Sequence, residues 1–128
     1  MSIERYMVSG ELEPVSHYCH VVKAGGLVWL SGMVGMKADG TIPEGTVEQF
    51  EIALKTIDTC LREAGGKPNQ IVKVQIFMTD ISERSSINPI RIEYFGDHKP
   101  ASTLVEVSAL VDPRMRVEIE AVAYIDDK

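Results

Sequence analysis

The sequence lacks several features that would place it in a specialised class of protein. It contains only 2 cysteines among its 128 residues, and neither Cys19 nor Cys60 belongs to a Cys-x-x-Cys pair, so a disulfide framework or a zinc ribbon is not expected. No apolar run reaches the roughly 18 residues that a membrane span requires, and the first residues contain no signal-peptide pattern. These absences predict a soluble, cytoplasmic protein without a membrane partner.

Positive charge is also scarce. The chain has 13 Lys and Arg residues against 19 Asp and Glu residues, which gives a formal net charge of −6. The basic residues form no cluster, and nucleic-acid binding depends on such clusters to contact phosphates. A nucleic-acid partner is therefore not expected. The same charge disfavours an anionic small substrate unless a cation is supplied locally.

Hydrophobic residues make up 45% of the chain, which suits a single domain spanning residues 1–128. A short strand is expected around residues 4–9. Two β-rich runs, 18–24 and 27–31, flank Gly25 and Gly26 and predict a hairpin, because this glycine pair can adopt the positive φ of a tight turn. Residues 33–45 are expected to form a loop.

Two helices are expected after this loop. Thr46 and Gln49 have the spacing of a capping box, and Gly65 follows the end of the first helix. Its apolar stripe consists of Phe50, Leu54, Ile57, Leu61 and Ala64. A buried strand over 71–79 should place Val72, Val74, Ile76 and Met78 on one face. The second helix should end near Phe95, with Pro89 in its first turn.

Residues 99–124, KPASTLVEVSALVDPRMRVEIEAVAY, predict two alternating strands joined by a turn. One face carries Thr103, Val105, Val107, Val117, Ile119, Ala121 and Ala123. The other carries Ser102, Leu104, Glu106, Glu118, Glu120, Val122 and Tyr124. Pairing these strands with Val107 opposite Val117 would place Leu104 opposite Glu120 and Ser102 on the same face.

The expected order β-ββ-α-β-α-ββ predicts an α+β fold with a mixed six-stranded sheet and two helices on one face. Two helices leave the second sheet face open. That face would expose Leu104, Val122 and Tyr124, and exposed apolar patches often mark subunit contacts. A homo-oligomer is therefore expected.

Three segments together resemble the Rid family of reactive intermediate deaminases, formerly called YjgF. They are LVWLSGMVG at 27–35, INPIRIEYFGDHKPAS at 87–102 and VEIEAVA at 117–123. The resemblance implies a chorismate-mutase-like domain that forms homotrimers and binds small metabolites in clefts between subunits. It also implies hydrolysis of enamines and imines, such as 2-aminoacrylate, without metal or organic cofactor.

The resemblance also implies roles for particular residues. Tyr18 corresponds to the cleft tyrosine of the family, Asn88 to its helix-start asparagine, Ser31 and Gly32 to the backbone segment that cradles the ligand, and Glu120 to the catalytic acid that positions water. The family motif reads Pro-Ala-Arg followed by Ser or Thr, whereas here Pro100 and Ala101 precede Ser102 and Thr103. The carboxylate-binding arginine is thus replaced by Ser102, and Leu104 occupies the position of a cysteine found in some members. Ser102 and Thr103 are candidate ligand hydroxyls.

Several alternatives remain open on the sequence alone. The protein is either a deaminase acting on a substrate other than 2-aminoacrylate or a trimeric binding protein without turnover. The missing cation could come from Arg91, Arg114 or Arg116, although all three are also typical surface charges.

Simpler structural roles compete with the proposed site roles. Tyr18 could equally be a hairpin aromatic, and Asn88 could be a helix cap. Ser31 lacks the surroundings of a nucleophile. No metal site is expected from HYCH at 17–20, because alternate strand residues point to opposite faces. A ribonuclease role, another label of this family, lacks the necessary basic stripe.

Overall fold

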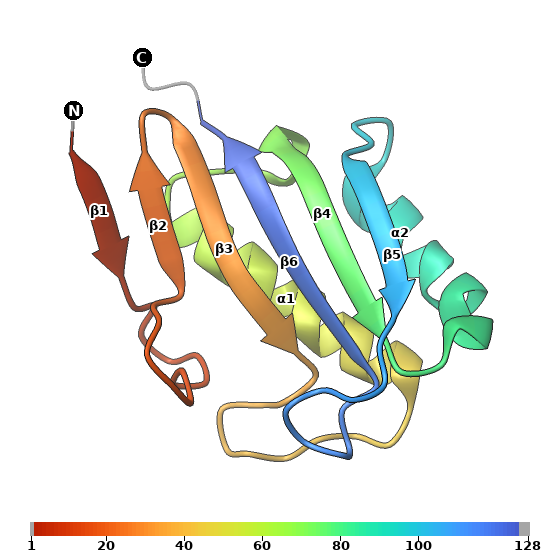
Figure 1. Cartoon of the computed structure of the whole chain (residues 1–128). Helices are drawn as coiled ribbons and strands as arrows, with labels where there is room; N and C mark the ends of the chain where they lie inside the picture. Colours follow the sequence, from red (N-terminus) through yellow and green to blue (C-terminus); the bar gives the residue numbers. More distant parts are fainter. Residues whose placement is uncertain (1, 126–128) are drawn as a thin grey trace.

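The structure is a computed structural model, and it describes residues 2–125. The α+β fold with a mixed six-stranded sheet and two helices on one face is confirmed (Figure 1). The elements are β1 (Ile3–Tyr6), β2 (Val21–Ala24), β3 (Leu27–Val34), α1 (Thr46–Glu63), η1 (Pro68–Gln70), β4 (Ile71–Met78), η2 (Ile81–Ile87), α2 (Asn88–Phe95), β5 (Ala101–Glu106) and β6 (Val117–Tyr124). Within the described chain, no helix is long and apolar enough to cross a membrane.

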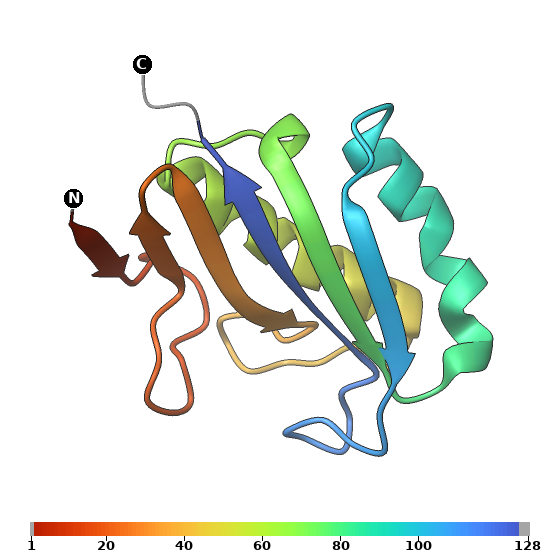
Figure 2. The same ribbon diagram turned by 45° about the horizontal axis from the view of Figure 1, so that its top comes forward.

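The strands follow the order β1-β2-β3-β6-β4-β5, as the view in Figure 2 also shows. All neighbours are antiparallel except β4 and β5, which are parallel. The expected pairing of the last two strands is therefore wrong, because β4 lies between β5 and β6. The physical reason is the crossover through η2 and α2, which returns the chain to the sheet beside β4 and in the same direction.

This topology also corrects the predicted faces of β5. Ser102 pairs with Val74 and Thr103 with Gln75, and Gln75 pairs in turn with Glu120. Val74 is buried beneath the helices, so Ser102 faces the helix side, whereas Thr103 shares the open face with Glu120. Leu104 does not lie opposite Glu120.

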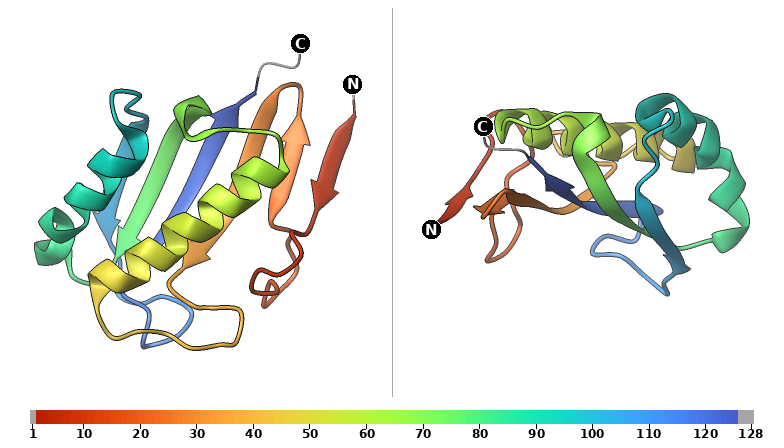
Figure 3. Two further views of the ribbon diagram at one scale, coloured as in Figure 1. Left: turned by 180° about the vertical axis from the view of Figure 1, so that it is seen from behind. Right: turned by 90° about the horizontal axis from the view of Figure 1, so that it is seen from above.

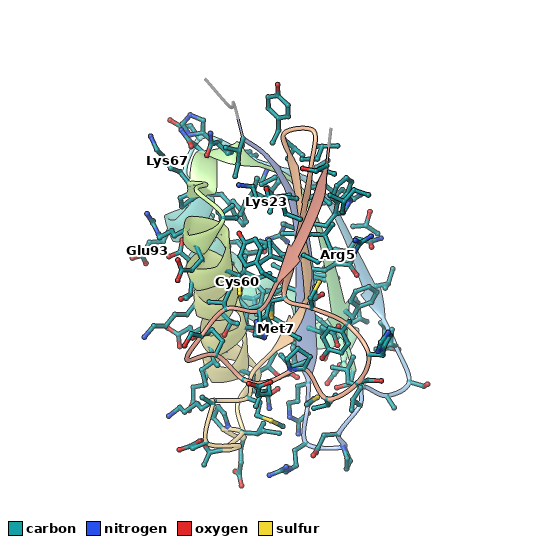
Figure 4. The ribbon with its side chains drawn as sticks, turned by 90° about the vertical axis from the view of Figure 1, so that its left-hand side faces the viewer. Arg5, Met7, Lys23, Cys60, Lys67 and Glu93 are labelled. Carbon is teal, nitrogen blue, oxygen red and sulfur yellow. The ribbon has the colours of Figure 1, made fainter. Side chains whose placement is uncertain are left out.

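The core lies between the sheet and α1. The predicted stripe of α1 is buried, and Figure 3 shows α1 and α2 on the same side of the sheet. Cys60 lies in this interior, as Figure 4 shows, while Lys67 and Glu93 lie toward the outer side of the helices. Burial raises the pKa of the Cys60 thiol to about 12, so it remains protonated at neutral pH.

Three local details differ from the sequence predictions. Thr46 does not form a capping box, because Gly45 precedes α1 and the Thr46 hydroxyl donates to Glu83 at 2.9 Å. Asn88 is not the N-cap of α2, because Ile87 occupies that position, and Asn88 instead ends η2, where its backbone N–H donates to the Ser85 carbonyl. Val72 is 47% exposed, because the register between β4 and β6 shifts at this point.

The open face of the sheet remains partly apolar. Trp29 of β3, Val105 of β5 and Tyr124 of β6 are 41%, 41% and 52% exposed. Strand β5 is also an edge strand with only one neighbour in the described chain. Edge strands and open apolar faces favour further association unless they are protected.

Candidate functional site

An irregularity in β3 creates the centre of the candidate site. Leu30 pairs with Ala121 and Met33 pairs with Ile119, so Ser31 and Gly32 together lie opposite Glu120. Two residues opposite one is the definition of a β-bulge. Because of this extra residue, both Leu30 and Met33 point into the core.

Glu118 lies directly over Gly32. A methyl group added at Gly32 would collide with the Glu118 carboxylate and displace it from this position. Burial, and secondarily the negative charge of Glu120, raise the pKa of the Glu118 carboxyl above its ordinary value. Partial loss of water disfavours the charged form of an acid, and so does a like charge nearby.

A cavity of about 480 Å³ lies beside this carboxylate. Its walls come from the loop between β1 and β2, from strand β3 and the loop after it, and from the region between β5 and the start of β6. The first and the last of these loops project on the open side of the sheet, as the view from above in Figure 3 shows. The lining residues are Leu12, Val15, Ser16, Tyr18, Ser31, Gly32, Val34, Met36, Val111, Asp112, Met115 and Glu118.

Buried His20 anchors the first of these loops. Its Nδ1 accepts a hydrogen bond from the Val8 backbone N–H at 2.8 Å, and its Nε2 lies 2.8 Å from the Leu12 carbonyl. Nε2 therefore carries the proton and donates a hydrogen bond to the Leu12 carbonyl. His20 is thus engaged on both ring nitrogens by the backbone.

The Ser31 hydroxyl also has a structural partner. It donates to the Cys19 carbonyl at 2.6 Å. The Ser31 backbone N–H donates to the carbonyl of the next residue, His20. These bonds hold the backbone of Cys19 and His20, next to Tyr18, against the bulge. A hydroxyl bound in this way stabilises the wall of the cavity and is not positioned as a nucleophile.

The predicted site residues form three groups. Tyr18, Ser31 and Gly32 line the cavity together. Glu120 is half-buried on the open face, outside the cavity lining, and Thr103 is on the same face, where its hydroxyl accepts from the Lys73 Nζ at 3.1 Å.

Ser102 and Asn88 form the third group, at the far edge of the sheet. Ser102 accepts a hydrogen bond from Arg91 of α2 at 2.8 Å, and Asn88 begins the same helix. One protomer does not bring this edge and the cavity together, because Ser102 faces the helix side.

The residue that sequence reasoning missed is Glu118. The segment Glu118-Ile119-Glu120 presents two acids on one face, and the pattern alone does not distinguish them. The distinction depends on the position of the bulge in β3, which places Gly32 beneath Glu118. A larger hollow of about 530 Å³ lies along α1 and α2 and contains none of the predicted site residues.

Comparison with known proteins identifies the class to which this fold belongs. A family model described as endoribonuclease L-PSP matches residues 8–125. A RutC family protein of Aquifex aeolicus is 40% identical over 113 residues, which cover 86% of this chain and 90% of that protein.

Two further matches cover nearly the whole chain. The 2-iminobutanoate/2-iminopropanoate deaminase of Mus musculus is 34% identical over 127 residues, covering 95% of this chain and 93% of that protein. The crystal structure of the Rid-family protein YyfA from Yersinia pestis superposes with a TM-score of 0.91 at 31% identity, covering 97% and 100% of the two chains. The chain belongs to the Rid family, also named after YjgF and RutC.

Proposed function

We propose that this protein hydrolyses small imines and enamines to a carbonyl compound and ammonia. The observation that carries this proposal is the partly desolvated Glu118 carboxylate over Gly32, at the wall of a cavity of about 480 Å³. The deaminase name of the mouse relative supports the same chemistry.

The proposed reaction begins when a water molecule attacks the imine carbon. Glu118 accepts the water proton as general base and then returns it to the nitrogen. Glu118 then takes the hydroxyl proton of the resulting carbinolamine and passes it to the nitrogen as the C–N bond breaks, which releases ammonia and leaves the carbonyl oxygen derived from water. An enamine enters this path after it takes up a proton on carbon and becomes the imine.

Glu120 remains a candidate for the same role. It lies two residues from Glu118 on the same face, and its charge contributes to the raised pKa of Glu118. We favour Glu118 as the base and Glu120 as the residue that tunes it, because only Glu118 lines the cavity.

Oligomer formation is part of the proposal. We propose a cytoplasmic homotrimer whose clefts lie between subunits. The support comes from the exposed apolar residues of the open face and the single-neighbour edge of β5.

Strand β5 carries Ser102 where the family motif has an arginine. Because a serine hydroxyl does not supply the bidentate fork that a guanidinium offers to a carboxylate, we expect 2-aminoacrylate to be a poor substrate unless an arginine from another element binds its carboxylate.

The decisive experiment compares Glu118→Gln with Glu120→Gln. Imines are generated in situ by an amino-acid oxidase, 2-aminoacrylate by a PLP-dependent dehydratase, and ammonia release is followed. We expect Glu118→Gln to lower the rate about 10²–10⁴-fold, the usual contribution of a general base, and Glu120→Gln to lower it less.

The outcomes separate the two functions. Equal activity of wild type and Glu118→Gln above background would exclude the proposed mechanism. Binding of keto acids without turnover in any variant would favour a trimeric binding protein, for which the loss of the family arginine is the supporting observation.

A further inference from the structure

Helix α2 carries a charge on the side that faces the protein. Ile87 and Phe95 are buried, and Ile90, Arg91 and Tyr94 are half-buried. Residues at this spacing form one face of a helix. Arg91 therefore occupies a position on the inward stripe, where an apolar residue is normally expected.

Arg91 has no acidic partner within residues 2–125. The two salt bridges of this part of the chain are Arg62 with Asp58 and Arg114 with Asp112. Burial lowers the pKa of the Arg91 guanidinium, although an arginine side chain remains protonated in proteins. The described part of the chain thus holds a partly desolvated positive charge without an acidic partner at salt-bridge distance.

Arg91 is also directed toward the sheet edge. Its Nη2 donates to the Ser102 hydroxyl at 2.8 Å. A guanidinium has five N–H donors in a planar fork, so most of them are available for another acceptor. Asn88 lies three residues earlier, on a neighbouring part of the same helix surface, and its side chain is exposed.

The other two candidate arginines, Arg114 and Arg116, already make hydrogen bonds within the protein. Arg114 donates from Nε and Nη2 to the Asp112 carboxylate at 3.1 and 2.9 Å. Arg116 donates from Nε to the Glu44 carbonyl at 3.3 Å. Arg91 is the one whose charge is both partly buried and free of a carboxylate in the described chain.

We infer that Arg91 and Ser102 form a binding subsite for the carboxylate group of a short imino or keto acid. The identity of this ligand rests on the proposed function. The guanidinium supplies the charge and a planar pair of donors, and Ser102 fixes its orientation at the β5 edge. The guanidinium thus reaches the edge from α2 and not from β5, and the substrate's acid group is bound there.

The subsite needs the proposed trimer to act in catalysis. Ser102 faces the helix side at the edge of the sheet, whereas Glu118 faces the cavity on the open side. A neighbouring copy seated against the β5 edge would bring its own cavity toward Arg91. Carboxylate binding itself does not require turnover, so it is measured separately.

The test measures binding of 2-oxobutanoate and of its uncharged amide, 2-oxobutanamide, by NMR titration of the intact protein. We expect the wild type to bind the acid at least about tenfold more tightly than the amide, given the strength of charge-assisted hydrogen bonds. Arg91→Met should remove this preference, because methionine fills the half-buried position without charge. Ser102→Ala should weaken acid binding by a smaller factor.

Two control variants make the result specific. Arg84→Met removes an exposed arginine of η2 and should leave the preference intact. Arg91→Lys keeps the positive charge and should keep part of the preference for the acid. The melting temperature and assembly state of each variant report any damage to the fold.

An unchanged preference in a folded Arg91→Met protein would overturn the inference, and so would equal binding of acid and amide by the wild type. If acid binding depends on Arg91 but no imine is hydrolysed, the subsite stands and the proposed function fails. If imines are hydrolysed equally by wild type and Arg91→Met with the same KM, the proposed function stands and the subsite fails.

Discussion

Glu118 is the residue whose protonation should set the pH dependence of the proposed reaction. A general base acts in its ionised form, and burial together with the Glu120 charge raises the pKa of Glu118. We therefore expect kcat/KM to rise with pH and to level off above a midpoint higher than that of an ordinary glutamate. In Glu120→Gln, one of the two causes is removed, and the midpoint should move to lower pH.

The raised pKa of Glu118 also makes the stability of the protein depend on pH. When the folded-state pKa of an acid is raised, the folded protein binds a proton over a pH range where the unfolded chain has lost it. The contribution of Glu118 to stability is thus more favourable below the ordinary glutamate pKa and declines as pH rises through the raised value. Glu118→Gln should remove this decline in urea titrations across the acidic range, and a decline of the same size in the variant would contradict the assignment.

Gln49 is the main side chain that connects α1 to the loops around it. It is fully buried on α1, its Nε2 donates to the carbonyls of Pro43 and Arg114 at 2.8 and 2.9 Å, and its Oε1 accepts from the Arg116 N–H at 2.8 Å. One side chain therefore holds the loop after β3 and the loop before β6, both of which contribute to the cavity.

Gln49→Leu should destabilise the protein by roughly 2–5 kcal/mol, because it removes three part-buried hydrogen bonds to backbone groups at once. Chemical denaturation measures this loss. Gln70→Leu is the matched control, since Gln70 makes an exposed hydrogen bond to the Lys67 N–H, and it should cost less than about 1 kcal/mol. Similar losses in both variants would show that Gln49 is not a special connection.

The elements also explain how far the sequence could predict this structure. Helix α1 and strand β4 are predicted closely, because their apolar periodicity is regular over many residues. The placement of β5 is not, since a local alternation does not reveal that a helical crossover inserts β4 between β5 and β6. The prediction of Tyr18, Ser31 and Gly32 on one wall depended on family resemblance, and Glu118 depends on a bulge that no residue pattern announces.

For the whole molecule, the open face predicts association. We expect light scattering to give three times the 14.2 kDa mass of one chain. Trp29→Glu introduces a charge at an exposed apolar position of this face and should shift the protein toward monomers. Val47→Glu introduces the same charge on α1, at a residue that is 37% exposed, and should leave assembly unchanged. A monomeric wild type at micromolar concentration would remove the basis for a site between subunits.

The bulge at Ser31 and Gly32 shifts the alternation of β3 side chains between the two sheet faces by one residue. Deleting Ser31 would restore an uninterrupted two-residue alternation, with Leu30 and Met33 still directed inward and Gly32 alone opposite Glu120. The apolar core would thus tolerate the shorter strand, while the bond from the Ser31 hydroxyl to the Cys19 carbonyl would be lost. Among related sequences, the presence or absence of this one residue should therefore separate chains that keep the pocket wall from chains that retain only the scaffold.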